Sequence, residues 1–554
     1  ENNQVRWRGH SDTEVLLSAI GNWGLQKTLD KCRGMFAFAL WDKQERKLNL
    51  VRDRIGQKPL YYGKVGNFFA FASELKALCT LKEWNNPVNW ESTALFLRYG
   101  YIPSPSSIYQ NIFKLPPGCL VQVDSDGRYS DPISWWSFDQ FALQNISAPF
   151  EGDENEMVRG LQSVLAASVK EQMVADVPVG ALLSGGIDSS LIVSLAQSQS
   201  SQPIKTFTVG FSEGQYDEMA QAKEVATHLR TDHTELRVSY LDALKLIPKL
   251  SEIFDEPFGD SSQIPTSLVF ALTNKFVKVC LSGDAGDEMF GGYNRYFWTE
   301  KVWSRIERLP KTGRSMGSQL LFRIPTPVLN GLYRSVAPAL PSHMKISNPG
   351  DKLHKLAGVL GAESPENLYQ LLVSQWRGEL PLLGIKEPSV LMSESEHWLP
   401  VSSLAEKMMA VDSKNYLPDD ILVKVDRSSM AASMESRIPF LDERVMEFAW
   451  RLPMKMKLRS GEGKWILKKL LDLYVPKKLV DRPKQGFGVP IESWLRGPLR
   501  DWAEDLLSVK KLNKDGVIDP APVRKKWAEL MSGKNVQHAV WNVLMYQAWR
   551  ERWR

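Results

Sequence analysis

A serine- and glycine-rich turn near the middle of the chain has the residue types of an anion-binding site. Its sequence is S-G-G-I-D-S, with Ser184, Gly185, Gly186, Asp188 and Ser189 as the residues able to do chemistry. Two adjacent glycines let the backbone approach a ligand without a Cβ clash. Successive backbone N–H groups in such a turn, with the following helix N-terminus and the hydroxyls, bind phosphate oxygens. The turn therefore predicts a phosphate site.

The segments on either side of the turn narrow its chemistry. Apolar residues 179–183 predict a buried parallel strand, and residues 191–196 predict a helix. The turn has neither the lysine of a Walker loop nor the glycine spacing of a dinucleotide-binding turn. It resembles the pyrophosphate loop of the ATP-pyrophosphatases, which cleave ATP between the α and β phosphates. The competing interpretation is an ordinary Ser/Gly turn, and Asp188 with the flanking strand and helix favours the phosphate loop.

A second group of reactive side chains follows the apolar run at residues 276–282. Asp284, Asp287 and Glu288 place three carboxylates within five residues, beside glycine-containing turns. Three neighbouring carboxylates repel one another unless a positive charge lies close by. A magnesium-bound polyphosphate would supply that charge. Mg²⁺ takes one or two protein carboxylates and completes its shell with phosphate and water. Acids at a helix N-terminus are the alternative. The sequence predicts that Asp188 and Asp287 face one ion if their strands are neighbours.

The elements that must hold these two turns form a strand–helix alternation in the second part of the chain. This pattern predicts a parallel sheet, with ligands at the strand C-termini, where both turns fall. The expected strands are residues 179–183, 205–211, 234–238 and 276–282. From about residue 293 onward the pattern is mostly helical. The sequence thus predicts an α/β C-terminal domain with a helical final part.

The first part of the chain has a different pattern, with short apolar runs separated by turns. It predicts hairpins of antiparallel sheets, an α+β domain. The expected strands are residues 35–41, 48–52, 60–62 and 68–72. An acidic, polar break at residues 151–156 places the domain boundary there. We therefore expect two domains, residues 1–150 and residues 151–554.

Composition excludes several classes of protein. The 554 residues are 43% hydrophobic and 24% charged, as in globular domains. A net charge of +5 without a basic arm argues against nucleic-acid binding, and the lysines at residues 464–469 and 477–478 are expected on solvated helix faces or ends. The chain has no apolar run of about 18 residues, which argues against a membrane span. Four separated cysteines without a C-x-x-C pair argue against a zinc site and fit the cytoplasm.

Both turns, together with the N-terminal strands, resemble the glutamine-dependent asparagine synthetase family of the asparagine synthase B type, along nearly the whole chain. The resemblance in the first part indicates an N-terminal-nucleophile (Ntn) glutaminase domain, here incomplete, and in the second an ATP-pyrophosphatase domain. The matching segments are residues 11–17, 33–42 and 52–62 in the first part, and both turns with residues 425–430, 435–442 and 482–487 in the second.

The resemblance implies a ligase reaction. The aspartate side-chain carboxylate would attack the ATP α-phosphorus and release pyrophosphate, and ammonia from glutamine would then displace AMP from the β-aspartyl-adenylate. ATP and Mg²⁺ are the implied cofactors, and aspartate, ATP and glutamine or ammonia are the small-molecule partners. A homodimer is the candidate assembly.

The same resemblance assigns roles to individual residues. Ser184, Gly185, Gly186, Asp188 and Ser189 would hold pyrophosphate. The residues that would line the adenosine site are Leu182, Val209, Ser282 and Gly283. Asp188 and Asp287 would hold Mg²⁺, and Asp12 would receive the glutamine amino group. Lys484 would neutralise charge on the departing phosphate, its competing interpretation being a surface lysine. Asp12 is also compatible with a helix cap.

Two departures from the family pattern affect the expected chemistry. The family nucleophile is a cysteine at the mature N-terminus, whereas Glu1 stands first here. Either the chain is a truncated piece of a longer protein, which the intact downstream strands favour, or its glutaminase is inactive. As given, it is expected to use free ammonia. In addition, Asp284 stands where familiar members carry Glu, which leaves a base role at that position open.

Three alternatives to asparagine synthesis stay open from the sequence. A lactam-forming synthetase of the same architecture would need no glutaminase, but it needs a base dyad that the sequence does not identify. A relative that amidates a sugar carboxylate in surface-polysaccharide synthesis is compatible with Asp284. A non-catalytic homologue is the third alternative, and the intact turns argue against it.

Overall fold

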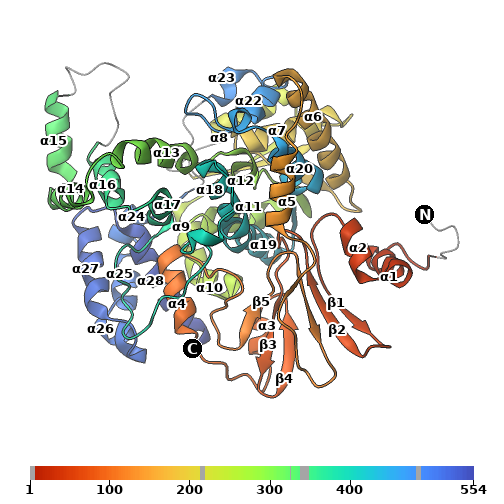
Figure 1. Cartoon of the computed structure of the whole chain (residues 1–554), viewed down its shortest axis with the longest axis horizontal. Coiled ribbons are helices and arrows are strands. Elements are labelled where there is room, and N and C mark those ends of the chain that lie inside the picture. Colours follow the sequence, from red (N-terminus) through yellow and green to blue (C-terminus); the bar gives the residue numbers. More distant parts are fainter. Residues whose placement is uncertain (1–6, 212–218, 325, 337–348, 482–487) are drawn as a thin grey trace.

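The computed structural model describes residues 7–211, 219–324, 326–336, 349–481 and 488–554. Within these residues the strands form three sheets, two antiparallel in the first part of the chain and one parallel in the second (Figure 1). The antiparallel and parallel sheets predicted from the sequence are confirmed. None of the helices in the described residues is both long and apolar enough to span a membrane.

The two antiparallel sheets pack face to face through one apolar core. The first has the order β1-β2-β6-β7, with strands β1 (Ala37–Asp42), β2 (Lys47–Arg52), β6 (Cys119–Val123) and β7 (Ile133–Ser134). The second has the order β4-β3-β5, with strands β4 (Phe68–Ala72), β3 (Tyr61–Val65) and β5 (Ile112–Lys114). Leu50 and Val121 of the first sheet pack with Tyr62 of the second.

Both predicted hairpins form. Strand β1 pairs antiparallel with β2, and β3 pairs antiparallel with β4. Because side chains alternate along a strand, Leu50 faces the second sheet while Val51 packs with Leu29. Leu29 belongs to helix α2 (Leu25–Lys31), which with α1 (Asp12–Trp23) lies beside β1 and β2 (Figure 1).

The parallel sheet has the order β10-β9-β8-β11-β12. Its strands are β8 (Val179–Leu182), β9 (Lys205–Phe211), β10 (Asp232–Val238), β11 (Val279–Leu281) and β12 (Glu435–Arg437). Strand β8 pairs with both β9 and β11, so the turns that follow β8 and β11 meet at one edge of the sheet. This adjacency is what the shared-ion prediction requires.

The helices of the second part pack around this sheet and beyond it. Helix α6 (Glu154–Gln172) opens with a capping box formed by Asp153 and Glu156. Those that bear on the site are α7 (Ile187–Ser198), α8 (Met219–Leu229), α11 (Gln263–Thr273), α12 (Gly286–Phe290), α19 (Leu422–Ala431) and α22 (Trp465–Leu471). The helical final part also contains α13 (Asn294–Ile306), α14 (Lys311–Arg323), α15 (Thr326–Val336), α16 (Pro349–Leu360), α17 (Pro365–Val373), α18 (Leu404–Lys414), α20 (Glu443–Arg451), α25 (Arg500–Leu506), α27 (Pro520–Met531) and α28 (Gln537–Trp553).

Several elements differ from the sequence expectation, among them β11, which is Val279–Leu281 and not residues 276–282. Helix α7 begins at Ile187, four residues before the predicted segment, because Gly186 takes an extended conformation and caps it. The turn residues Asp188 and Ser189 therefore lie in the first helical turn. Strand β12, only three residues long, was not predicted, because its sequence E-S-R has no apolar alternation. It is a strand because it pairs with β11.

Buried polar contacts join the two parts of the chain. Tyr61 donates its hydroxyl to Glu256 at 2.9 Å, and Lys114 lies 3.1 Å from the same carboxylate. Lys58 and Asp426 form an ion pair of 2.8 Å. Since buried carboxylates without partners are strongly destabilising, these contacts fix how the N-terminal sheets sit against the second part.

The packing of the central strand generates a stability prediction. A Cβ on Gly180 would lie 2.7 Å from the Phe207 ring and 3.1 Å from the Lys205 carbonyl oxygen. Gly180→Ala is therefore expected to lower the free energy of unfolding by about 1–3 kcal/mol, measured by urea denaturation. The matched control is Gly331→Ala in α15, where a Cβ meets nothing within 4 Å and alanine is expected to stabilise the helix by up to about 1 kcal/mol. If the two variants had the same free energy of unfolding, the close packing of Phe207 against Gly180 would be contradicted.

Candidate active site

A cavity of about 1040 Å³ opens at the edge of the parallel sheet where β8, β9 and β11 end. This is at the upper end of the range of small-molecule sites, about 300–1000 Å³. Eleven residues singled out in the sequence line it, namely Leu182, Ser184, Gly185, Gly186, Asp188, Ser189, Val209, Ser282, Gly283, Asp284 and Asp287. The structure thus brings together residues from positions 182 to 287, although their individual roles stay predictions.

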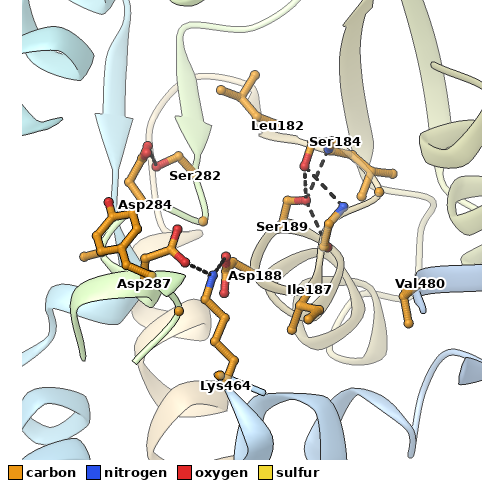
Figure 2. A pocket seen from close by; sticks show the side chains of 18 of the residues that line it. Leu182, Ser184, Ile187, Asp188, Ser189, Ser282, Asp284, Asp287, Lys464 and Val480 are labelled. Atoms are coloured by element: carbon orange, nitrogen blue, oxygen red, sulfur yellow. Dashed lines mark hydrogen bonds and ion pairs between the residues drawn. The ribbon is translucent and has the colours of Figure 1, made fainter. Parts of the chain in front are cut away.

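The first turn has the geometry of a compact anion cradle. Gly185 has a φ of 75°, and a Cβ there would lie 2.9 Å from the Gln221 side chain and 3.0 Å from the backbone N of Ala222. The hydroxyls of Ser184 and Ser189 are 2.9 Å apart, and the Gly186 N–H donates to the Ser184 hydroxyl at 3.3 Å (Figure 2). The turn therefore presents small residues and hydroxyls at the start of α7, where a helix favours negative charge.

The second turn lies directly against the first. A Cβ on Gly283 would lie 2.8 Å from the backbone N of Ser189 and 3.0 Å from the Asp188 backbone. Only glycine allows this approach, because the atoms in the way belong to the backbone. The contact brings Asp287, one helical turn further on, to the same side of the cavity as Asp188.

Lys464 joins the two carboxylates. Its Nζ contacts the Asp188 carboxylate and lies 2.7 Å from Oδ1 of Asp287 (Figure 2). The lysine side chain is only 6% exposed. Burial alone would lower the pKa of Lys464, but the two carboxylates outweigh burial and raise it. The lysine therefore stays protonated between the two acids.

Lys464 corrects a sequence expectation. Residues 464–469 were expected on a solvated helix face, and that is wrong for Lys464, which precedes α22 with a φ of 57°. The available signal was the G-E-G-K sequence before an apolar helix. Gly463 allows a close approach, since a Cβ there would lie 2.1 Å from the Gly291 carbonyl oxygen. Glycine here serves to bring the lysine into the cavity.

The carboxylates of the site fit a magnesium–phosphate complex and not an all-protein metal cage. Two carboxylates, Asp188 and Asp287, already converge on one cationic group. In the part of the chain that the structure describes, no group of three or more His, Cys, Asp or Glu side chains could hold a metal. Mg²⁺ uses such a pair when phosphate and water supply the remaining oxygens. The assignment of these two residues to Mg²⁺ stays a prediction.

Asp284 also lines the cavity. Figure 2 shows it beside Ser282, with Asp188 between it and Ser184. Ser282 donates its hydroxyl to Oδ2 of Asp284 at 2.8 Å. Burial raises the pKa of Asp284, and Lys424 and the Ser282 hydrogen bond oppose that rise. Burial, followed by the nearby charge of Asp287, also raises the pKa of Glu288 to about 7.

Two predicted residues do not join this group. Asp12 is exposed on the first turn of α1, which Ser11 caps, and it does not line the cavity. Lys484 lies outside the described residues. The four cysteines are free thiols, which agrees with the absence of a disulfide framework in the sequence.

Comparison with known proteins gives matches along nearly the whole chain. Residues 160–551 match the family model described as asparagine synthase, and residues 1–136 match the glutamine amidotransferase domain model. The chain is 30% identical to the glutamine-hydrolysing asparagine synthetase 1 of Bacillus subtilis (strain 168), covering 97% of this chain and 80% of that protein. A Mycobacterium bovis protein, named provisionally as the same enzyme, is 32% identical, with 97% and 79% covered. An amidase of Gibberella zeae is 25% identical, with 93% and 78% covered.

The Lys464 bridge generates a prediction that needs no substrate. Lys464→Met removes the cation that joins two neighbouring carboxylates, and we expect the free energy of unfolding to fall by about 3–5 kcal/mol. Millimolar Mg²⁺ should then raise the Tm of this variant more than that of the wild type, because the divalent ion replaces the lysine charge. The matched control is Lys468→Met, whose exposed pair with Glu462 contributes less than about 1 kcal/mol. A Tm of Lys464→Met that does not respond to Mg²⁺ would exclude convergence of the two acids on one ion.

Proposed function

Because the chain belongs to the asparagine synthase family, we propose that it catalyses ATP-dependent amide formation on aspartate. A side-chain carboxylate oxygen of aspartate attacks the α-phosphorus of ATP, and the bond to the β-phosphate oxygen breaks, releasing pyrophosphate. Ammonia then attacks the acyl carbon of the β-aspartyl-adenylate, AMP leaves, and the nitrogen loses a proton. The products are asparagine, AMP and pyrophosphate.

The observation that carries this proposal is the meeting of the two turns in one cavity. Strand β8 pairs directly with β11, so an anion cradle and two carboxylates face the same space. A nucleotide triphosphate with its metal is the ligand that uses both features. The serine turn would hold the pyrophosphate, with Ser184, Gly185, Gly186, Asp188 and Ser189. Leu182, Val209, Ser282 and Gly283 would line the adenosine site.

The negative charge of the triphosphate would be balanced by Mg²⁺ and by lysine side chains during the first step. Asp188 and Asp287 would hold Mg²⁺, which when bound screens the phosphate charges and orients the triphosphate. Lys484 would neutralise the charge that develops on the departing pyrophosphate, as the resemblance implies, and Lys464 is a second lysine that would do so from within the cavity. The lysine is held in place by two carboxylates, so it is oriented before substrate arrives. Asp284 would face the acceptor.

The nitrogen source is proposed to be glutamine, by way of ammonia, in the whole enzyme. The support is the glutamine amidotransferase match of residues 1–136 and the two face-to-face antiparallel sheets. Asp12 would receive the glutamine amino group. We propose domains of residues 1–150 and 151–554, with the reaction in the cytoplasm, where the free thiols stay reduced.

The test is aspartate-dependent ATP–pyrophosphate exchange, which reports the first step without any nitrogen donor. Asp188→Ala removes one proposed metal ligand and the acid that orients Lys464, so the exchange rate is expected to fall by about 10²- to 10³-fold. The control is Asp126→Ala, an exposed residue of a distant hairpin turn, which should leave exchange unchanged. Exchange that survives Asp188→Ala unaltered would contradict the metal assignment.

A further inference from the structure

A second buried lysine lines the cavity near Asp284, and we call this part of the cavity the acceptor end. Lys424 of α19 lines the cavity with a side chain that is 11% exposed. Its Nζ donates to Oδ2 of Asp260 at 2.7 Å and to the Ser262 hydroxyl at 2.8 Å. Asp260 and Ser262 also line the cavity. An ammonium group has three N–H donors. Asp260 and Ser262 accept two of the hydrogen bonds of Lys424, so a ligand oxygen can accept the third.

The neighbours of Lys424 keep it and Asp260 charged. Burial acts to raise the pKa of Asp260, but Lys424 and Ser262 outweigh burial and hold the pKa below its usual range. Burial, followed by the nearby charge of Asp260, raises the pKa of Asp420 well above its usual range. The pKa of Lys424 is raised, since Asp260, Asp420 and Asp284 outweigh its burial. The wall therefore presents one cation and one anion side by side.

This pair is separate from the phosphate end of the cavity. Lys464 is occupied by Asp188 and Asp287, whereas Lys424 is paired with Asp260. The charges of both lysines oppose the rise of the Asp284 pKa that burial causes, Lys424 more strongly than Lys464. Asp284 is on the side of Asp188 opposite to the serine turn (Figure 2). A molecule that reaches the α-phosphorus from this side would have its remaining groups beside Lys424 and Asp260.

We propose that Lys424 and Asp260 are the residues that select a zwitterionic amino acid as acceptor. Lys424 binds the α-carboxylate, and Asp260 binds the α-ammonium group, while the Ser262 hydroxyl donates to Oδ2 of Asp260 at 2.7 Å and holds that carboxylate in place. The reacting side-chain carboxylate then points toward the phosphates. The inference rests on the proposed function. It separates an amino acid acceptor from a sugar acid or a simple dicarboxylate, which lack one or both of the matching charges.

Acceptor analogues test this selection on the wild-type chain. Exchange is measured with aspartate, with β-alanine, which lacks only the α-carboxylate, and with succinate, which lacks only the amino group. Each charged hydrogen bond is worth about 1.5–3 kcal/mol, so each analogue is expected to have a kcat/KM about 10- to 100-fold below that of aspartate. If either analogue performs as well as aspartate, the charge pair does not select the acceptor.

A variant assigns the carboxylate contact to Lys424. Lys424→Met is expected to raise the KM for aspartate about 10- to 100-fold, to leave the KM for MgATP within about twofold, and to lower kcat/KM for β-alanine little, since β-alanine has no group for Lys424. Lys424→Arg, which keeps the charge, should recover part of the loss. The control is Lys278→Met, an exposed lysine next to β11 at the opposite edge of the sheet.

The outcomes separate this inference from the proposed function. If the wild type shows no exchange with any of the three acids, the proposed function fails. If it exchanges with aspartate but Lys424→Met keeps the wild-type KM for aspartate, the inference fails alone. If Lys424→Met has lost its cooperative thermal unfolding, Lys424→Gln takes its place, and a fall in the ratio of kcat/KM for aspartate to that for β-alanine supports the inference, whereas an unchanged ratio overturns it.

Discussion

The ion bridge of Asp188, Lys464 and Asp287 is the constraint on which the rest of the site depends. Two carboxylates in a poorly solvated cavity repel each other strongly, and a single lysine between them turns that repulsion into attraction. The bridge requires β8 and β11 to be neighbours and Gly283 to lie against the backbone of Ser189. The ion bridge thus depends on the order of the strands, on the position of Gly283 and on the αL conformation of Lys464. A magnesium-bound polyphosphate would fit into this arrangement of charges.

The sequence was sufficient for the parts of the site that are local. The serine turn and the acid-rich turn each follow an apolar strand, and their residue types specify a backbone geometry over a few positions. Their adjacency could be expected because parallel strands place their C-terminal ends at one edge. Strand β9 lies where the pattern predicted it, since a run such as T-F-T-V-G-F has both β-propensity and burial.

The missed features all depend on contacts between distant residues. Lys464 contacts Asp188 across 276 positions, and Lys424 meets Asp260 across 164, so neither partner is visible in a local window. A lysine-rich stretch has the composition of a solvated helix face, and only its tertiary position shows that Lys464 is buried. Strand β12 is likewise defined by pairing with β11 and not by its own pattern. A local sequence pattern therefore identifies the turns of the site but not the side chains, such as Lys464 and Lys424, that come from distant parts of the chain.

Helix α19 connects the acceptor end of the cavity to the N-terminal sheets. Lys424 faces the cavity, whereas Asp426 and Arg427 of the same helix contact the N-terminal part. Asp426 pairs with Lys58, and Arg427 donates to the Ser73 carbonyl and pairs with Glu74. Arg427 is 2% exposed, so these contacts are buried and well defined. The position of Lys424 is therefore set from both sides, by Asp260 within the cavity and by the N-terminal sheets behind it. An altered fit between the two parts of the chain is therefore expected to move α19 and, with it, Lys424.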